Sequence, residues 1–162
     1  MPLASRAIFQ WSPGSGVGFT WTSCFGAEVN SLAGITGGNA ILSSIVIDNS
    51  VALDQYCDFS ISLGSVATTG APFIGVYLYP LNQDGTSYGD GRFGTTAAGP
   101  AGSTYAVGNI TVPVGTQVLT GCLRKIELPP GKFKFVVHNA TNIALAASAN
   151  TLSYRTYNLS TL

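Results

Sequence analysis

The feature that most constrains the fold is a strict two-residue alternation in residues 56–63. Apolar side chains occupy every second position there: Cys57, Phe59, Ile61 and Leu63. Successive side chains of a β-strand point to opposite faces, so this pattern predicts a strand with one buried face. The polar residues between them, including Asp58, are expected on the other face. We expect Asp58 to pair there with a side chain of a neighbouring strand.

Comparable segments recur along the chain, separated by glycine, proline and asparagine. They lie at residues 17–25, 40–48, 56–63, 73–79, 105–112, 117–128, 133–137, 142–147 and 151–157. In the first of them Trp21 is expected on the apolar face. No segment keeps a helical period over ten or more residues. Roughly eight or nine strands spaced by turns predict an all-β fold, a single β-sandwich or barrel, over residues 17–162.

Charge is scarce in this chain. Of its 162 residues, 7 are Lys or Arg and 7 are Asp or Glu, so the net charge is zero and charged residues make up 9%. Nucleic-acid binding needs a basic footprint, which this composition lacks. The chain shows no signal-peptide pattern and no run of 18 apolar residues, so we expect no membrane partner. A protein with zero net charge does not repel further copies of itself, which favours a role as a component of a larger assembly.

The few charges are unevenly distributed along the sequence. Residues 1–120 hold 2 basic and 6 acidic residues, whereas residues 121–162 hold 5 basic and 1 acidic. Two arrangements follow from this. The two segments either interleave in the sheets and neutralise each other within one subunit, or they form complementary patches between subunits.

Residues 1–16 have the composition of an N-terminal arm. Ile8, Phe9 and Trp11 are large apolar residues in a segment punctuated by Gly and Pro, too short to fold alone. Such an arm either packs on its own sandwich or lies across a neighbour, where it can add a strand to a partner's sheet. We therefore predict partner-binding roles for Ile8, Phe9 and Trp11.

No pattern in the sequence indicates a catalytic centre. The single histidine, His138, is expected at the end of a strand, bonded to a neighbouring backbone group. Cys24, Cys57 and Cys122 are widely spaced, which is typical of thiols that act as small apolar residues. Asp54 and Asp58 are four residues apart but do not form the opposed pair that a glycosidase needs. We predict a protein that is not an enzyme and uses no cofactor.

A turn-rich stretch at residues 81–100 contains the one metal candidate. Asp84 and Asp90 flank a Gly-rich loop with hydroxyl side chains, which hard cations such as Ca²⁺ accept as ligands. The alternative is ordinary Asp-Gly turn chemistry, and we favour it and predict no metal site. A sugar-binding platform could be built from four tyrosines, Tyr77, Tyr79, Tyr88 and Tyr105. The alternative is that Tyr77 and Tyr79 are partly buried at a sheet or subunit face.

Two stretches of the sequence resemble small virion proteins of tailed bacteriophages, of the capsid decoration or cement type. The first comprises Tyr56–Gly64, Gly75–Pro80 and Asp84–Tyr88, and the second comprises Arg124–Phe135, His138–Asn139 and Tyr154–Asn158. Together they cover about half of the chain.

The resemblance implies a jelly-roll-like β-sandwich that binds the outer surface of a capsid. The expected partners are the major capsid protein and further copies of the chain, as a homotrimer. The protein would be made in the host cytoplasm and reside on the virion. Tyr77, Tyr79 and Tyr88 join the arm as expected partner-binding residues. The alternative is a carbohydrate-binding or receptor-binding tip domain of a phage fibre, which would display a row of exposed aromatic rings.

Overall fold

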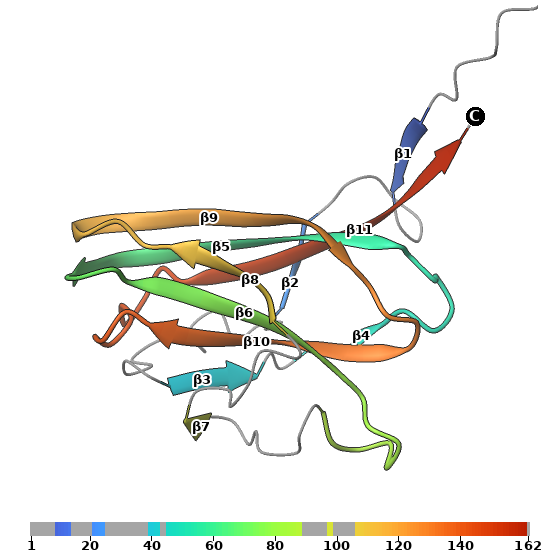
Figure 1. Cartoon of the computed structure of the whole chain (residues 1–162), viewed down its shortest axis with the longest axis horizontal. Helices are drawn as coiled ribbons and strands as arrows, with labels where there is room; N and C mark the ends of the chain where they lie inside the picture. Colours follow the sequence, from blue (N-terminus) through green and yellow to red (C-terminus); the bar gives the residue numbers. More distant parts are fainter. Residues whose placement is uncertain are drawn as a thin grey trace, which may run out of the picture.

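The computed structural model describes residues 9–13, 21–24, 39–42, 45–88, 97–98 and 106–161. Within these ranges the chain forms eleven β-strands and no helix (Figure 1). The strands are β1 (Phe9–Pro13), β2 (Thr22–Ser23), β3 (Asn39–Leu42), β4 (Ile47–Asp48), β5 (Tyr56–Thr68), β6 (Phe73–Pro80), β7 (Ala97–Ala98), β8 (Ala106–Thr111), β9 (Gly115–Glu127), β10 (Lys132–Ala140) and β11 (Thr151–Thr161). The all-β prediction is confirmed. In the described part of the chain, no helix has the length and apolar character to cross a membrane.

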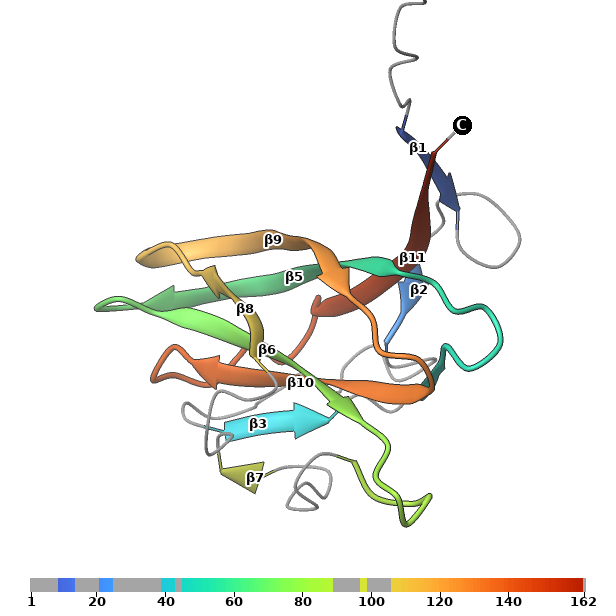
Figure 2. The ribbon, with the colours of Figure 1, turned by 45° about the vertical axis from the view of Figure 1, so that its right-hand side comes forward.

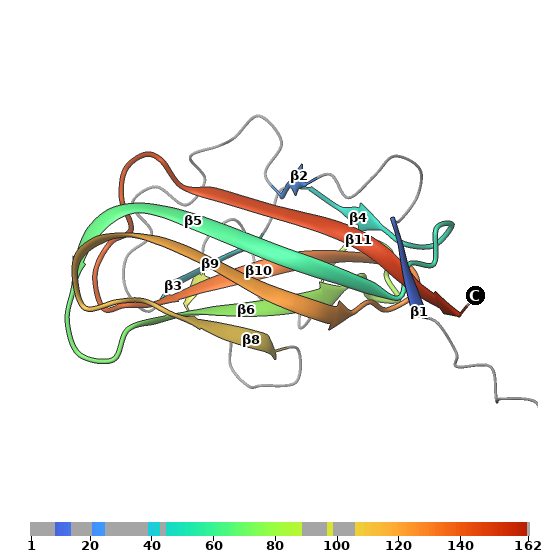
Figure 3. The same cartoon turned by 90° about the horizontal axis from the view of Figure 1, so that it is seen from above.

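The strands form two antiparallel sheets. Sheet A has the order β1-β11-β5-β9, and β2 also pairs with β11. Sheet B has the order β7-β3-β10-β6-β8, and β4 also pairs with β10. Figures 1 and 3 show β11, β5 and β9 as one layer over β10, β6 and β8 as the other. The architecture is therefore compatible with the predicted sandwich.

The alternation that predicted a strand at residues 56–63 places the core. The four apolar side chains of that segment are completely buried, and they face the apolar residues of β6 and β10 across the two sheets. The Phe59 ring of sheet A, for example, lies 4.9 Å between centroids from the Phe135 ring of sheet B. Burial of this apolar surface from both sheets is the main force that holds the layers together.

Two strands were not expected from the sequence: β1 lies in the segment interpreted as an arm, and β7, with two residues, lies in the turn-rich stretch at 81–100. The apolar run at 40–48 was expected as one strand, but the structure divides it into β3 and β4. Both pair with β10.

The predicted strand at 142–147 is wrong. Asn139 Oδ1 accepts hydrogen bonds from the backbone N–H and the hydroxyl of Thr141, at 3.0 and 2.6 Å, and Asn139 Nδ2 donates to Ile143 O at 2.7 Å. Asn142 has a φ of 61°, a left-handed conformation in which Asn is among the tolerated residues. The chain therefore turns here, and Leu145 is buried against the core from a loop.

The prediction for Trp21 is also wrong. Its side chain is 41% exposed, whereas Cys24 is buried. Trp21 precedes β2, which pairs with Ser153 and Tyr154, and its ring lies 4.7 Å from the Arg155 guanidinium. Stacking on a cation lets the indole remain at the surface with one face covered.

Candidate binding surfaces

Three of the predicted partner-binding residues come together on sheet B, on the face turned away from the core. Tyr79 and Val136 form a small buried cluster there, and Tyr77 and Tyr88 pack against it. The Nζ of Lys134 lies 5.1 Å from the centroid of the Tyr88 ring, a cation–π distance. Because Tyr79 is buried, only Tyr77 and Tyr88 offer surface to a partner.

Of the predicted partner-binding residues of the N-terminal arm, those that the structure describes do not lie at this tyrosine cluster. Ile8 lies outside the described residues. Phe9 and Trp11 belong to β1, opposite Thr161 and Leu159 of β11. The structure does not bring them to the tyrosine cluster of sheet B, because β1 is an edge strand of sheet A and projects from the sandwich together with the end of β11 (Figure 1).

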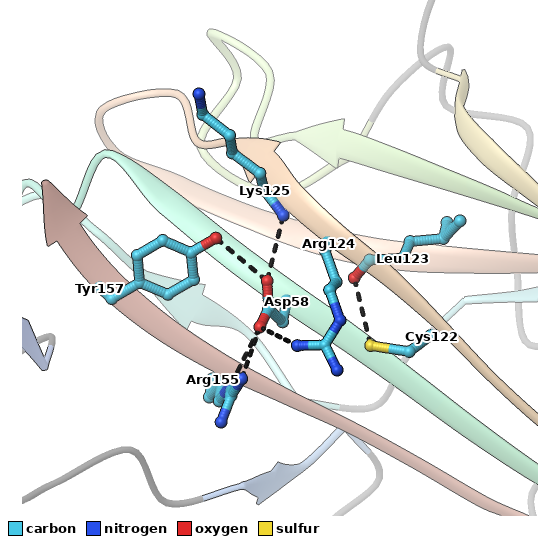
Figure 4. A network of polar contacts seen from close by, with 7 residues as sticks. All are labelled: Asp58, Cys122, Leu123, Arg124, Lys125, Arg155 and Tyr157. Carbon is cyan, nitrogen blue, oxygen red and sulfur yellow. Dashed lines mark hydrogen bonds and ion pairs between the residues drawn. The ribbon is translucent and has the colours of Figure 1, made fainter. Parts of the chain in front are cut away.

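A polar network surrounds Asp58 on the outer face of sheet A (Figure 4). Arg155 donates to Asp58 Oδ2 from Nε at 3.1 Å and from a terminal nitrogen at 2.8 Å, and Arg124 donates to the same oxygen at 3.3 Å. Oδ1 accepts from the Tyr157 hydroxyl and from the backbone N–H of Lys125, both at 3.0 Å. The predicted cross-strand partner of Asp58 is confirmed, and the carboxylate is 3% exposed rather than facing solvent.

An irregularity of the β5–β9 ladder makes this network possible. The register shifts between Cys57 and Phe59, so that Arg124 and Lys125 together lie opposite Asp58. Lys125 has a φ of 55°. A β-bulge of this kind turns a backbone N–H out of the ladder and re-aims the side chains around it. Here the released N–H points at the Asp58 carboxylate.

The network fixes the charge states of its members. Burial by itself would raise the pKa of Asp58, but the hydrogen bonds from Arg155, Lys125 and Tyr157 outweigh it and hold the pKa below its usual value. Burial, together with the hydrogen bond to Asp58, raises the pKa of Tyr157 to about 12. Asp58 is therefore a stable anion and Tyr157 a stable donor, a structural arrangement without a proton poised for transfer near neutral pH.

Aromatic rings border this network. Tyr56 lies 5.9 Å from Tyr157 between ring centroids, and the Lys125 ammonium is 5.2 Å from the Tyr56 centroid. Trp21 adds its ring above Arg155. The outer face of sheet A thus combines partly exposed rings with cationic groups.

A second surface lies at one end of the sandwich, in the loop between β4 and β5. Val51 is 90% exposed and Leu53 is 58% exposed. The loop nevertheless has fixed internal bonding. Asn49 is buried, its Nδ2 donates to Asp54 O at 2.9 Å and to Pro129 O at 3.1 Å, and its Oδ1 accepts from Asp54 N at 2.7 Å. Two aliphatic side chains are therefore held in solvent by an ordered turn.

An apolar groove opens beside this loop. Its volume is about 390 Å³, and it is lined by Leu78, Pro80, Ala106, Val107, Glu127, Leu128 and Pro129. Leu128 N donates to Gln55 O at 3.0 Å, so the groove and the β4–β5 loop share a wall. We call the loop and the groove together the apolar end of the sandwich; Figure 1 shows the loop at the right-hand end of β5.

The metal candidate is only partly described, because Asp90 lies outside the described residues. Asp84 Oδ1 accepts from the backbone N–H groups of Thr86 and Ser87, both at 2.9 Å, and the Ser87 hydroxyl donates to its other oxygen. These bonds lower the pKa of Asp84 to about 2. This is the Asp-Gly turn chemistry that the sequence favoured, and within the described residues no group of three His, Cys, Asp or Glu side chains could hold a metal ion.

The remaining reactive side chains are those of the three cysteines and the histidine. Cys24 and Cys57 are buried and Cys122 is exposed, all as free thiols. His138 lies near the end of β10, opposite Gly75 and Ala40, in agreement with its predicted place at a strand end. The ion pairs found in the described part of the chain, Asp58 with two arginines and Asp48 with Lys132, each join the acidic and basic segments of the sequence. This favours interleaving within one subunit.

Comparison with protein-family models, with curated proteins and with solved structures found no match for this chain.

Sequence reasoning missed the apolar end. Val51 and Leu53 follow an Asp-Asn-Ser turn signal, Asp48–Ser50, and an apolar residue within such a turn is a recognisable pattern. The bracing role of Asn49 had no local signal, because its partner Pro129 is 80 residues away.

Proposed function

We propose that this protein is a structural virion protein that binds the outer surface of a tailed-phage capsid, as a decoration or cement protein with a jelly-roll fold. The sequence resemblance supports the class. The strand order supports the fold, and the apolar end supports the mode of binding.

The strand order supports a jelly roll as follows. β1 and β2 follow the same edge of β11, and β3 and β4 follow the same edge of β10, so each pair counts as one strand. Without the two-residue β7, eight strands remain. Sheet A then has the order first-eighth-third-sixth, and sheet B has the order second-seventh-fourth-fifth. A jelly roll distributes its eight strands in this way, and viral capsid and lectin domains both use it.

The observation that carries the binding proposal is the exposure of Val51 and Leu53 on a braced turn. Two exposed aliphatic side chains on an ordered loop, next to a groove lined mostly by apolar side chains, would form an apolar patch of the kind that marks an interaction site. Because Asn49 fixes the loop, little conformational entropy is lost on binding. The proposed occupant is the major capsid protein, with the apolar end facing the shell.

Self-association completes the proposal. With a net charge of zero, copies do not repel one another, and we propose a homotrimer on the virion surface. Contacts among the copies and with the shell would then add through avidity, so that each single contact can be weak.

The test uses variants that leave the fold intact. Leu53 has a φ of 50°, which suits Asn better than Leu, so Leu53→Asn removes the apolar side chain without straining the turn. Combined with Val51→Ser, it should reduce cosedimentation with decoration-free capsids at least tenfold. The matched control is Val118→Ser, because Val118 is 64% exposed in β9, toward the opposite end of the sandwich. Unchanged binding of the double variant, or equal loss in the control, would refute docking through this end.

A second candidate function is supported by one observation. Trp21 is 41% exposed beside Arg155 of the Asp58 network, and exposed rings with a polar rim are typical of sugar-binding sites. A carbohydrate-binding or receptor-binding tip domain would bind specific glycans on an array and lose that binding in Trp21→Ala. Absence of glycan binding by the wild-type protein would remove this candidate.

A further inference from the structure

The N-terminal strand β1 is attached at an unusual place. It pairs with the last five residues of β11, Tyr157–Thr161, whereas β5, the other neighbour of β11, pairs only as far as Tyr157. Beyond that point β1 and β11 form a ribbon of two strands that leaves the sandwich (Figure 2). A two-stranded ribbon alone is marginally stable in water, so the association of β1 with its own chain is weak.

The two strands of this ribbon are not anchored equally. Leu159 N donates to Gln55 Oε1 at 3.2 Å, and Asn158 exchanges hydrogen bonds with Gln55 N and Asp54 Oδ1 at 2.9 and 3.0 Å. The β4–β5 loop therefore holds the end of β11 in place. Among the described residues, the recorded backbone pairing of β1 is with β11 only. β11 is thus a fixed template, and β1 is the exchangeable strand.

The length of chain between β1 and β2 permits the exchange. Pro13 faces Tyr157 and Thr22 faces Tyr154, so the two strands re-enter the same edge of β11 three residues apart, about 10 Å. The chain takes nine steps from residue 13 to residue 22 and can span about 30 Å. The reach of this segment is therefore roughly three times the distance that it must span when β1 and β2 pair with the same β11. β1 can therefore reach another copy while β2 stays on its own β11.

We propose that in the assembled protein β1 of one copy pairs with Tyr157–Thr161 of a second copy. The register would be the one seen within the chain, from Phe9 opposite Thr161 to Pro13 opposite Tyr157. Exchange replaces each contact with an identical one, which makes it a low-cost route to an oligomer. Passed around a ring, it would hold together the copies of the proposed homotrimer. It involves no capsid surface and no residue of the apolar end.

Disulfide trapping between separately prepared variants tests the exchange. Gln10 lies opposite Ser160. A Gln10→Cys protein and a Ser160→Cys protein, both also carrying Cys122→Ser, are mixed and oxidised. Neither can form this bond within one chain, so a heterodimer linked between positions 10 and 160 reports exchange. The control mixes Gln10→Cys with Val118→Cys, whose exposed thiol measures random collision. We expect the exchange pair to yield at least tenfold more linked heterodimer.

A second measurement covers the case in which the paired thiols do not oxidise. Light scattering should give an oligomer for the full chain and a monomer for the chain lacking residues 1–13. The proposal is overturned if the full chain is a monomer over the whole concentration range, or if the truncated chain keeps the same mass. It is also overturned if the Gln10→Cys/Ser160→Cys double variant forms its bond within one chain while the mixture matches the control. Capsid binding is absent from both assays, so their failure is distinct from failure of the proposed function.

Discussion

Gly121 of β9 lies so close to Ile110 of β8 that a β-carbon on Gly121 would be 2.3 Å from Ile110 Cγ2. The two residues belong to different sheets, and Ile110 is buried. A glycine on the inner side of β9 therefore sets how closely the sheets approach each other at this edge of the sandwich.

We predict that Gly121→Ala destabilises the protein by about 1–3 kcal/mol, because the added methyl group overfills a packed core. Denaturant unfolding measures this. The matched test is a double-mutant cycle with Ile110→Ala, which removes the clashing Cγ2 atom. The two substitutions together should cost less than the sum of their separate effects. Additive losses would show that Gly121 acts through something other than this contact.

Asp58→Ala should lower the free energy of unfolding by about 2–4 kcal/mol, because it removes the buried carboxylate that accepts hydrogen bonds from Tyr157 and Arg155. Asp48→Ala is the control. Its carboxylate forms a 3.6 Å ion pair with Lys132 in which both side chains are about half exposed. The loss there should be much smaller. Equal losses for the two variants would contradict a structural role for the Asp58 network.

The same carboxylate should leave a signature in the pH dependence of stability. The pKa of Asp58 is lowered in the folded protein, and its unfolded value is about 3.9. Its contribution is therefore complete above about pH 5 and is lost as the pH falls through the folded pKa. The difference in unfolding free energy between wild type and Asp58→Asn should shrink between pH 5 and pH 2.5. A difference in unfolding free energy that stays constant or grows as the pH falls would contradict a lowered pKa of Asp58 in the folded protein.

At the bulge residue Lys125, the ordinary preference of a β-strand for Val over Gly should be reversed. Because its φ is 55°, Lys125→Gly should be neutral or stabilising, whereas Lys125→Val should cost about 1–2 kcal/mol. Thr120, exposed in the same strand, supplies the comparison, since Val is preferred over Gly in an ordinary strand. Thermal unfolding of the four variants checks the reversal. The same preference at both positions would argue against a left-handed residue at 125.

Thiol reactivity should separate the three cysteines. Burial raises the pKa of Cys24 to about 12 and also raises that of Cys57, so neither forms a thiolate near neutral pH. Cys122 is exposed. A chromogenic disulfide reagent at pH 8 should therefore modify one thiol in the native protein and three after unfolding, and Cys122→Ser should abolish the native reaction. Rapid modification of two or more native thiols would contradict the burial of Cys24 and Cys57.

Much of sheet A and of the core could be predicted from the sequence because the signal there is local. The alternation in β5 specifies which side chains enter the core regardless of which strands are its neighbours. The turn after Asn139 could not be separated from a strand, since the apolar Leu145 fills the core from a loop. The left-handed conformation of Lys125 had no local signal either, because it depends on the register between two strands far apart in the sequence. The apolar end depends on a bond between residues 49 and 129.

The partners of Asp58 have a consequence for biosynthesis. The side chains that donate hydrogen bonds to this carboxylate lie 66 to 99 residues further along the chain. The two strands that pair with β5 are β9 and β11. In a nascent chain that has emerged only as far as β8, β5 therefore lacks both hydrogen-bonded neighbours, and its apolar side chains have no complete core to enter. Sheet A can close only after residues 151–157 have left the ribosome. Folding should therefore be largely post-translational and slow, as expected for a topology dominated by distant pairings, and the unpaired β5 is the segment that a chaperone would most need to shield.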